Sequence, residues 1–383
     1  MEFNQIKICR TTLRILRYSL IWPDEDEELN PGKRYYIRVL LFIVITSMWV
    51  ASVFMHLIMS LKSDLGTHLS EDCGFIIAFC GIYYMTFIYV KNQPKIALLL
   101  RDLSSFATFG KPPGFEQIEN KLSFWSKFCF SYAVAGIVVY NSIRLLQKSD
   151  CERINREEGL NENCGLLSPT WFPFKIDYFP VFHLVFLYIF VSTQILMKLA
   201  LMISFNALEM IHHIILRIDH LNIMIGQCFE DENYQVSGNK LKTCILYHLD
   251  ILDLSTRLDD CFSNCMFAHV FITAAICGCL EKQFVDGDNR IGALIHVLGW
   301  IMLLFLASLG GQQLIDAGVS ISESIWASQW YNADLRLKKD LLFMYRKSQT
   351  GFRLTAGSFS VLSFSLFLSV LKMSYSILTM LTS

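Results

Sequence analysis

Seven long apolar segments constrain the fold of this chain more than any other feature of its sequence. A helix needs roughly 20 predominantly apolar residues to cross the hydrocarbon core of a bilayer. Each of the seven segments is close to that length or longer, and none contains more than one charged residue. The segments cover residues 37–61, 73–90, 128–146, 178–197, 261–280, 291–309 and 354–381. We therefore predict an all-α membrane protein with seven transmembrane helices, and not a large soluble protein with buried helices.

The composition agrees with a membrane location. Of the 383 residues, 53% are hydrophobic and 17% are charged, whereas charged residues make up about 25% of a typical soluble domain. The formal net charge is −1, so there is no excess of basic residues to attract nucleic acid. The expected partner is therefore a lipid membrane, and no nucleic-acid partner is expected.

Lysine and arginine residues predict how the chain is oriented, because cytoplasmic loops carry an excess of them. The N-terminal segment and the loops on its side of the membrane contain 21 Lys and Arg, and the loops on the opposite side contain seven. The first set is 1–36, 91–127, 206–260 and 311–352, and the second set is 62–72, 147–177 and 281–290. We predict a cytoplasmic N-terminal segment, residues 1–36, which lacks the features of a secretory signal. Seven crossings then place the C-terminus outside the cell.

Residues 37–383 are predicted to form one seven-helix domain, because no internal repeat or low-complexity linker divides them. The loops assigned to the cytoplasm are long and show helical periodicity. Leu241, Ile245, Leu249 and Leu252, for example, share one helical face. The fourth, fifth and sixth spans are therefore predicted to continue as helices into a cytoplasmic anchor region.

The sequence carries no signature of an enzyme. It has no glycine-rich phosphate loop, no nucleophile elbow and no paired carboxylates within the spans. No Cys and His residues have structural-zinc spacing. His212, His213 and His220 are interpreted as part of a packed or solvated helix, and neither a metal nor a cofactor is expected. Cys151 and Cys164 share a predicted outer loop, where they are either a disulfide or free thiols.

The last apolar segment carries a polar stripe. Its members recur at steps of 4, 3, 4, 3 and 4, which places them on one face of a helix. They are Ser365, Ser369, Lys372, Ser376, Thr379 and Ser383. Lipid does not favour such a face, so the stripe lines a wet path or packs against other helices, where small polar residues allow close approach.

The C-terminal quarter resembles the insect odorant receptors. The resemblance rests on Trp330-Tyr331, "RKSQ" at 346–349, "LTAG" at 354–357 and "FLSVLKMSYS" at 367–376, in this order and spacing. The "WP" at 22–23, the length and the inverted topology are also similar to that family. The chain departs from the family pattern at two places. Gly351 stands where a proline is usual, and Ile377-Leu378 stand where an aromatic pair is usual.

The resemblance implies a ligand-gated, nonselective cation channel in the plasma membrane of olfactory sensory neurons. Such receptors form tetramers, usually with a co-receptor subunit, and the cytoplasmic ends of spans four to seven form most subunit contacts. Trp330 and Tyr331 are the expected contact residues here. The last span of each subunit lines a central pore, and odorants bind within each subunit among spans two to six.

On this interpretation the polar stripe lines the pore, because hydroxyl groups replace part of an ion's hydration without binding it strongly. The expected pore and gate residues are Ser365, Ser369, Lys372, Ser376, Thr379 and Met380, with the gate at Met380 from the family alignment. Lys372 is the exception, since four ammonium groups in one pore repel cations. A lysine stem that turns aside, or dilution in a hetero-tetramer, reduces that repulsion.

A volatile ligand needs an enclosed aromatic cavity with one or two polar groups. The candidate residues come from spans two, three, four and six. They are Tyr83, Tyr84, Gly136, Tyr140, His183, Phe186, Phe190, His296 and Trp300. Gly136 leaves room beside a ring, and a neutral histidine can donate a hydrogen bond to an alcohol, ester or ketone.

Three alternatives remain open from the sequence. A gustatory receptor has the same fold, but its tail typically closes with a Thr-Tyr and Gln motif, and "SYSILTMLTS" contains no Gln. A metabotropic seven-span receptor has the opposite orientation. The co-receptor itself typically has a longer loop between spans four and five.

The orientation gives a first prediction. An epitope placed at residue 2 is expected to react with antibody only after cells are permeabilised, because the basic residues hold this end in the cytoplasm. Immunofluorescence of intact and permeabilised cells measures this. Staining of intact cells would contradict the orientation and favour the metabotropic alternative.

Overall fold

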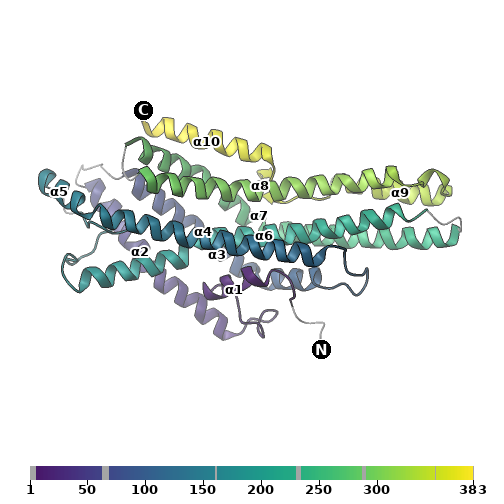
Figure 1. The fold of residues 1–383 in the computed structure, drawn as a ribbon, viewed down its shortest axis with the longest axis horizontal. Helices are drawn as coiled ribbons and strands as arrows, with labels where there is room; N and C mark the ends of the chain where they lie inside the picture. The colour runs from purple at the N-terminus through teal and green to yellow at the C-terminus, as the bar shows by residue number, and fades with distance from the viewer. Residues whose placement is uncertain are drawn as a thin grey trace.

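The computed structural model describes residues 6–62, 69–159, 162–229, 234–286, 290–349 and 351–382. These residues form an elongated bundle of helices with one short hairpin (Figure 1). The helices are α1 (Arg10–Tyr18), α2 (Lys33–Lys62), α3 (Leu69–Leu103), α4 (Phe115–Leu146), α5 (Lys148–Glu158), α6 (Val181–Gly226), α7 (Tyr234–Asp286), α8 (Arg290–Ala327), the 3-10 helix η3 (Trp330–Asn332), α9 (Leu335–Ser348) and α10 (Phe364–Thr382).

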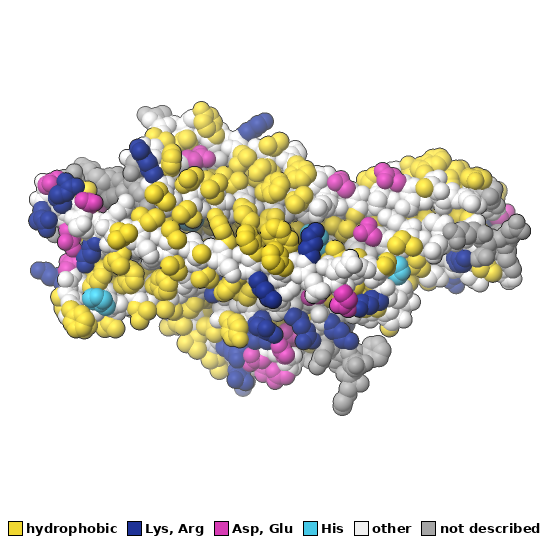
Figure 2. Space-filling view, viewed as in Figure 1, with side chains coloured by type: hydrophobic (Ala, Val, Ile, Leu, Met, Phe, Trp, Pro, Cys, Tyr) yellow, Lys and Arg dark blue, Asp and Glu magenta, His cyan; other side chains and the backbone are white. Residues whose placement is uncertain are grey.

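Seven of these helices, α2, α3, α4, α6, α7, α8 and α10, are long and apolar enough to cross a membrane. The prediction of an all-α protein with seven such helices is confirmed. Figure 2 shows apolar side chains over most of one face, while charged side chains gather at the α5 end and near α1. An apolar exterior of this extent is expected where lipid replaces water as the solvent.

Three helices are much longer than a membrane is thick. α6 has 46 residues, α7 has 53 and α8 has 38. At 1.5 Å per residue, α7 is roughly 80 Å long, whereas the hydrocarbon core is about 30 Å thick. The predicted extension of these helices is confirmed, and with α9 they form the right-hand end in Figure 1.

α3 also continues beyond its predicted span, to Leu103. This part belongs to residues 91–127, which the sequence predicts as a cytoplasmic loop. The helix forms because Ile96, Leu99 and Leu103 are buried among the long helices, and packing of an apolar face stabilises a helix that propensity alone does not.

α7 is the central helix, and it packs against α3, α6, α8 and α10. Leu258, Phe262, Cys265 and Met266 on α7 are all buried. A helix that is apolar on several sides needs such neighbours on each side.

The N-terminal segment is docked onto the bundle. α1 packs on α4 and α6, and the Thr12 hydroxyl donates to the Glu209 carboxylate at 2.8 Å. Trp22 is fully buried, and its indole nitrogen donates to Glu28 at 3.1 Å. Tryptophan at this position therefore stabilises the docking.

Arg38 lies at the start of the first span, where its charge is paired with that of Asp24. Its guanidinium donates two hydrogen bonds to Asp24, at 2.7 and 2.6 Å. These bonds lower the pKa of the Asp24 carboxyl from its ordinary value, because they stabilise its charged form.

The segment between α4 and α6 folds back over the end of the bundle. Cys151 and Cys164 form a disulfide, which resolves the two alternatives that the sequence left open. Beyond it, Trp49 donates from its indole nitrogen to the Ser168 hydroxyl at 3.0 Å. Leu167 is buried, so this segment covers part of the interior.

The last span begins at Phe364, and the predicted start at Leu354 is corrected. Residues 354–363 form a tight hairpin in which β1 (Thr355–Ala356) pairs antiparallel with β2 (Ser360–Val361). The Asp259 carboxylate accepts hydrogen bonds from the Thr355 amide at 2.6 Å and from its hydroxyl at 2.8 Å. Apolar composition alone does not distinguish such a hairpin from the first turns of a helix.

Gly311 on α8 allows this hairpin to approach. A Cβ atom at position 311 would lie 2.4 Å from the carbonyl oxygen of Leu362. We expect Gly311→Ala to lower the free energy of unfolding by about 1–3 kcal/mol, the usual cost of overpacking. Thermal unfolding of the detergent-solubilised protein, followed by size-exclusion chromatography, measures this.

Gly226→Ala is the matched control, because a Cβ at position 226 meets no atom within 4 Å. Equal thermal midpoints for the two variants would contradict the proposed close contact at Gly311.

Candidate functional site

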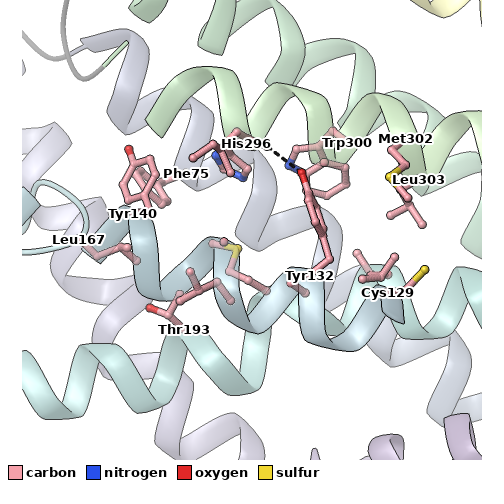
Figure 3. A pocket seen from close by; sticks show the side chains of 18 of the residues that line it. Phe75, Cys129, Tyr132, Tyr140, Leu167, Thr193, His296, Trp300, Met302 and Leu303 are labelled. Carbon is pink, nitrogen blue, oxygen red and sulfur yellow. Dashed lines mark hydrogen bonds between the residues drawn. The ribbon is translucent and has the colours of Figure 1, made fainter. Parts of the chain in front are cut away.

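A cavity of about 150 Å³ lies between α3, α4, α6 and α8 and is partly open to the outside of the bundle. Figure 3 shows side chains from these helices converging on it. Its lining is mainly apolar and aromatic. The lining residues are Phe75, Cys129, Tyr132, Ala133, Gly136, Ile137, Tyr140, Leu167, Thr193, Met197, Ala200, Leu201, Ile295, His296, Gly299, Trp300, Met302, Leu303 and Leu306.

α4 contributes one wall through residues spaced four apart. Tyr132, Gly136 and Tyr140 lie on the same face and line the cavity. A Cβ atom at Gly136 would lie 3.7 Å from a methyl carbon of Ile295, so the missing side chain leaves space between the two tyrosines. The Tyr132 hydroxyl donates to the Ile295 carbonyl at 3.5 Å, which links α4 to α8.

α8 contributes the opposite wall. The ring centroids of His296 and Trp300 lie 6.4 Å apart, and those of Tyr140 and His296 lie 6.3 Å apart. The ring centroid of His269, on α7, lies 6.2 Å from that of Trp300. The Tyr140–His296 pair is edge-to-face, an arrangement that aromatic quadrupoles favour.

One end of the cavity is polar. The Tyr140 hydroxyl donates to the Glu71 carboxylate at 3.4 Å, and Glu71 also forms an ion pair with Arg144. The Arg144 guanidinium lies 5.8 Å from the centre of the Tyr140 ring. A carboxylate is tolerated inside this bundle because a cation from the neighbouring helix neutralises it.

The structure brings four of the nine candidate ligand residues together. Gly136, Tyr140, His296 and Trp300 all line the cavity. The remaining five do not line it. Tyr83 is hydrogen-bonded to Thr46, Tyr84 and His183 are exposed, and Phe186 and Phe190 are partly buried on α6.

The candidates on α6 lie on a continuous face but near the start of the helix. His183, Phe186 and Phe190 are followed at the same 3-4 spacing by Thr193 and Met197, and these two line the cavity. Periodicity identifies the face of a helix and says nothing about depth. Phe75 and Tyr132 also line the cavity and are not among the candidates from the sequence, although Tyr132 lies four residues before Gly136.

The polar stripe on α10 faces away from the rest of the chain. The described members Ser365, Ser369, Lys372, Ser376 and Thr379 are exposed, and so is Met380. Ser383 lies outside the described residues. On α10, Val370 and Ser374 form the buried side. The stripe therefore does not pack against helices of the same chain, and Figure 1 shows α10 at the edge of the bundle.

The junction of α8 and α9 carries an exposed aromatic cluster, defined as Trp326, Trp330 and Tyr331. The rings of Trp326 and Trp330 lie 5.3 Å apart, and the exposed fractions of Trp326 and Tyr331 are both 62%. Leu342 and Phe343 of α9 are also exposed. This apolar surface lies at the end of the bundle that extends beyond the expected membrane.

The histidines near the middle of α6 have partners within the protein. His212 bonds to the Leu208 carbonyl at 2.9 Å, His213 to Glu119 at 3.1 Å, and His220 to Tyr247 at 3.4 Å. Within the described ranges, no group of three or more His, Cys, Asp or Glu is arranged to hold a metal ion.

Comparison with known proteins points to the same family that the C-terminal motifs resemble. A family model described as 7tm Odorant receptor matches residues 69–375. Odorant receptor 13a of Drosophila melanogaster is 26% identical over 160 residues, which are 38% of this chain and 38% of that protein. Odorant receptor Or1 of Anopheles gambiae is 24% identical over 174 residues, 44% of this chain and 39% of that protein. The matches thus span less than half the length of these curated relatives.

The fold has solved counterparts. The insect olfactory receptor OR5 from Machilis hrabei, solved in complex with eugenol, matches with a TM-score of 0.77. The match covers 97% of both chains at 14% identity. A second structure of that receptor matches with a TM-score of 0.72 and covers 97% of this chain and 96% of that chain, also at 14% identity. At this identity the match shows a shared fold. Together with the family match over most of the chain, these findings show that the protein is a multi-pass membrane protein that belongs to the insect odorant receptor family.

Proposed function

We propose that this protein is the odorant-binding subunit of a ligand-gated, nonselective cation channel in the plasma membrane of olfactory sensory neurons. The observation that carries the proposal is the partly open cavity with aromatic walls between four helices of one chain. An apolar cavity with a few convergent polar groups is the usual form of a small-molecule site. The family membership supplies the class of stimulus.

The size of the cavity suits a small volatile molecule. An engineered apolar cavity of about 150 Å³ binds benzene, and this cavity has the same volume. Aromatic side chains supply dispersion contacts, and the tyrosine hydroxyls and histidines supply a small number of hydrogen bonds. Eugenol bound to a receptor of the same fold is an aromatic molecule of comparable character.

The exposed stripe on α10 supports an assembly in which this helix lines a shared pore. Four copies of α10 around one axis would place the exposed hydroxyls along a wet path. In a hetero-tetramer with co-receptor subunits, fewer copies of Lys372 face the ions. Met380, with an exposed fraction of 71%, is placed to form the constriction.

The exposed aromatic cluster supports subunit contacts at the anchor end. Soluble surfaces rarely leave large apolar side chains uncovered as a group, and Trp326, Tyr331, Leu342 and Phe343 are all exposed on the elements at this end of the bundle. Tryptophan and tyrosine are also the residue types that contribute most to protein interfaces. The anchor end is proposed to face the cytoplasm, in line with the basic residues of its loops.

Substitution of the cavity wall is expected to change odorant sensitivity. Tyr140→Ala and His296→Ala remove rings that line the cavity, so the dose-response midpoint should shift by about tenfold or more for some ligands. Current recording from cells that co-express a co-receptor measures the shift. Tyr84→Ala is the control, because this tyrosine is exposed. Unchanged potency and efficacy for all ligands in both cavity variants, at normal surface expression, would place the site elsewhere.

Substitution of the stripe is expected to change permeation and leave odorant affinity unchanged. A lysine in the ion path repels cations within a Debye length of about 8 Å, so Lys372→Gln should raise the unit conductance. Cysteines placed at positions 376 and 379 should react with a water-soluble thiol reagent in the open state. Single-channel recording tests both expectations.

Phe367→Leu is the control for the stripe, because Phe367 contacts Phe305 of α8 at a ring distance of 5.6 Å. It should alter expression or assembly and not conductance. If the cysteines never react and Lys372→Gln leaves the conductance unchanged, α10 does not line the pore.

A further inference from the structure

A second, smaller cavity adjoins the ligand cavity at its polar end. Its volume is about 20 Å³, and it shares Phe75, Tyr140 and His296 with the larger one. Figure 3 shows these three side chains grouped at one end of the larger cavity. The other lining residues of the small cavity are Glu71, Gly74, Ile276, Cys279, Leu280 and Gln283. We refer to this space as the annex.

Gln283 is the polar side chain of the annex that keeps an available N–H donor. It lies on α7 with an exposed fraction of 3%, and its amide nitrogen makes no hydrogen bond of normal geometry. The Tyr140 hydroxyl is near enough to interact with one of its two N–H groups, so the other remains available. A buried amide donor without a partner is unfavourable, because it has lost its hydrogen bonds to water. An acceptor that enters the annex would restore that bond.

Two other polar groups around the annex, Tyr140 and Glu71, are already engaged. The Tyr140 hydroxyl donates to Glu71, and Glu71 is also paired with Arg144. An incoming group therefore meets a free donor at Gln283 and an acceptor, Glu71, that neighbouring groups already occupy. This arrangement favours a group that accepts a hydrogen bond and has no proton of its own to place.

The annex has room for about one non-hydrogen atom of the ligand group that enters it. A cavity needs roughly 10–15 Å³ of this kind of volume to hold one water molecule, and the annex has about 20 Å³. It is too small for an aromatic ring or an alkyl branch. A carbonyl oxygen fits, while the rest of the molecule stays in the larger cavity.

We propose that the annex binds the carbonyl oxygen of the odorant, with the Gln283 amide nitrogen as the donor, and that the receptor is selective for small ketones, aldehydes and esters over hydrocarbons of the same shape. The inference rests on the proposed odorant site in the larger cavity. Gln283 is then a specificity-determining residue at a place that no family motif indicated in the sequence.

The test compares three methyl ketones with alkenes in which a methylene group replaces the oxygen. The probes are 2-pentanone, 2-heptanone and 2-nonanone, each paired with its 2-methyl-1-alkene. The receptor is expressed with a co-receptor, and dose-response midpoints are recorded. The wild type should respond to at least one ketone at about tenfold lower concentration than to its alkene, since an unmade hydrogen bond to a buried donor has at least that effect.

Gln283→Leu should remove this preference by weakening the ketone response about tenfold, with the alkene response unchanged or stronger. Gln194→Leu is the matched control, because Gln194 lies on α6 and lines neither cavity, so it should keep the preference. If Gln283→Leu does not reach the cell surface, Gln283→Asn, which shortens the amide side chain, should reduce the preference in the same direction.

The outcomes separate the two proposals. No response of the wild type to any ketone, an unchanged ketone preference in the Gln283 variants, or an equal loss for ketone and alkene would each overturn the carbonyl subsite. Trp300→Ala tests the larger cavity independently. If that substitution changes the responses and the Gln283 variants do not, only the subsite is wrong. If Trp300→Ala also changes nothing, the proposed odorant site is wrong as well.

Discussion

In the hydrocarbon core of a bilayer there is no water to bond to backbone N–H and C=O groups, so the chain must satisfy these groups itself. Seven long helices do this along most of the sequence. The hairpin at 354–363, which precedes the last span, has no helical hydrogen bonds, and other groups of the protein satisfy part of its backbone. Asp259 accepts from the Thr355 amide at 2.6 Å, the Gly357 amide donates to the Ser263 carbonyl at 3.0 Å, and the two hairpin strands bond to each other.

Once the backbone groups are hydrogen-bonded, the sizes of the side chains on facing helices determine where cavities remain between them. Glycine lets elements approach at some positions and leaves room at others. At Gly311 a carbonyl oxygen fills the place of a side chain, whereas at Gly136 and Gly299 a Cβ atom would be 3.7 Å from its nearest neighbour, an ordinary contact distance. The cavity lies where these small residues of α4 and α8 meet aromatic rings that cannot fill the space completely.

The sequence was sufficient for the architecture because the membrane imposes a simple length requirement on apolar helices. It was sufficient for the faces of α4 and α8, where Gly136, Tyr140, His296 and Trp300 were chosen by helical spacing. It failed for depth along α6, because His183 and Met197 are equivalent in a periodic pattern. It also failed for Leu354, since an apolar hairpin and an apolar helix have the same composition. Gln283 was missed for a different reason. A single amide near the end of a helix belongs to no periodic sequence pattern, so only the cavity beside it in the structure indicates a role in binding.

α8 lies between the cavity and the outward-facing helix α10. Only the thickness of this one helix separates the two. Met302 and Leu306 of α8 line the cavity, and Phe305, on the adjacent face of the same turns, meets Phe364 and Phe367 of α10 at ring distances of 6.1 and 5.6 Å. A helix is a stiff rod whose side chains turn together. An axial rotation of α8 that withdraws Leu306 from a ligand therefore sweeps Phe305 across the surface of α10. The side chains of α8 that line the cavity and those that touch α10 thus belong to neighbouring positions of one helix, and direct ring contacts join that helix to α10.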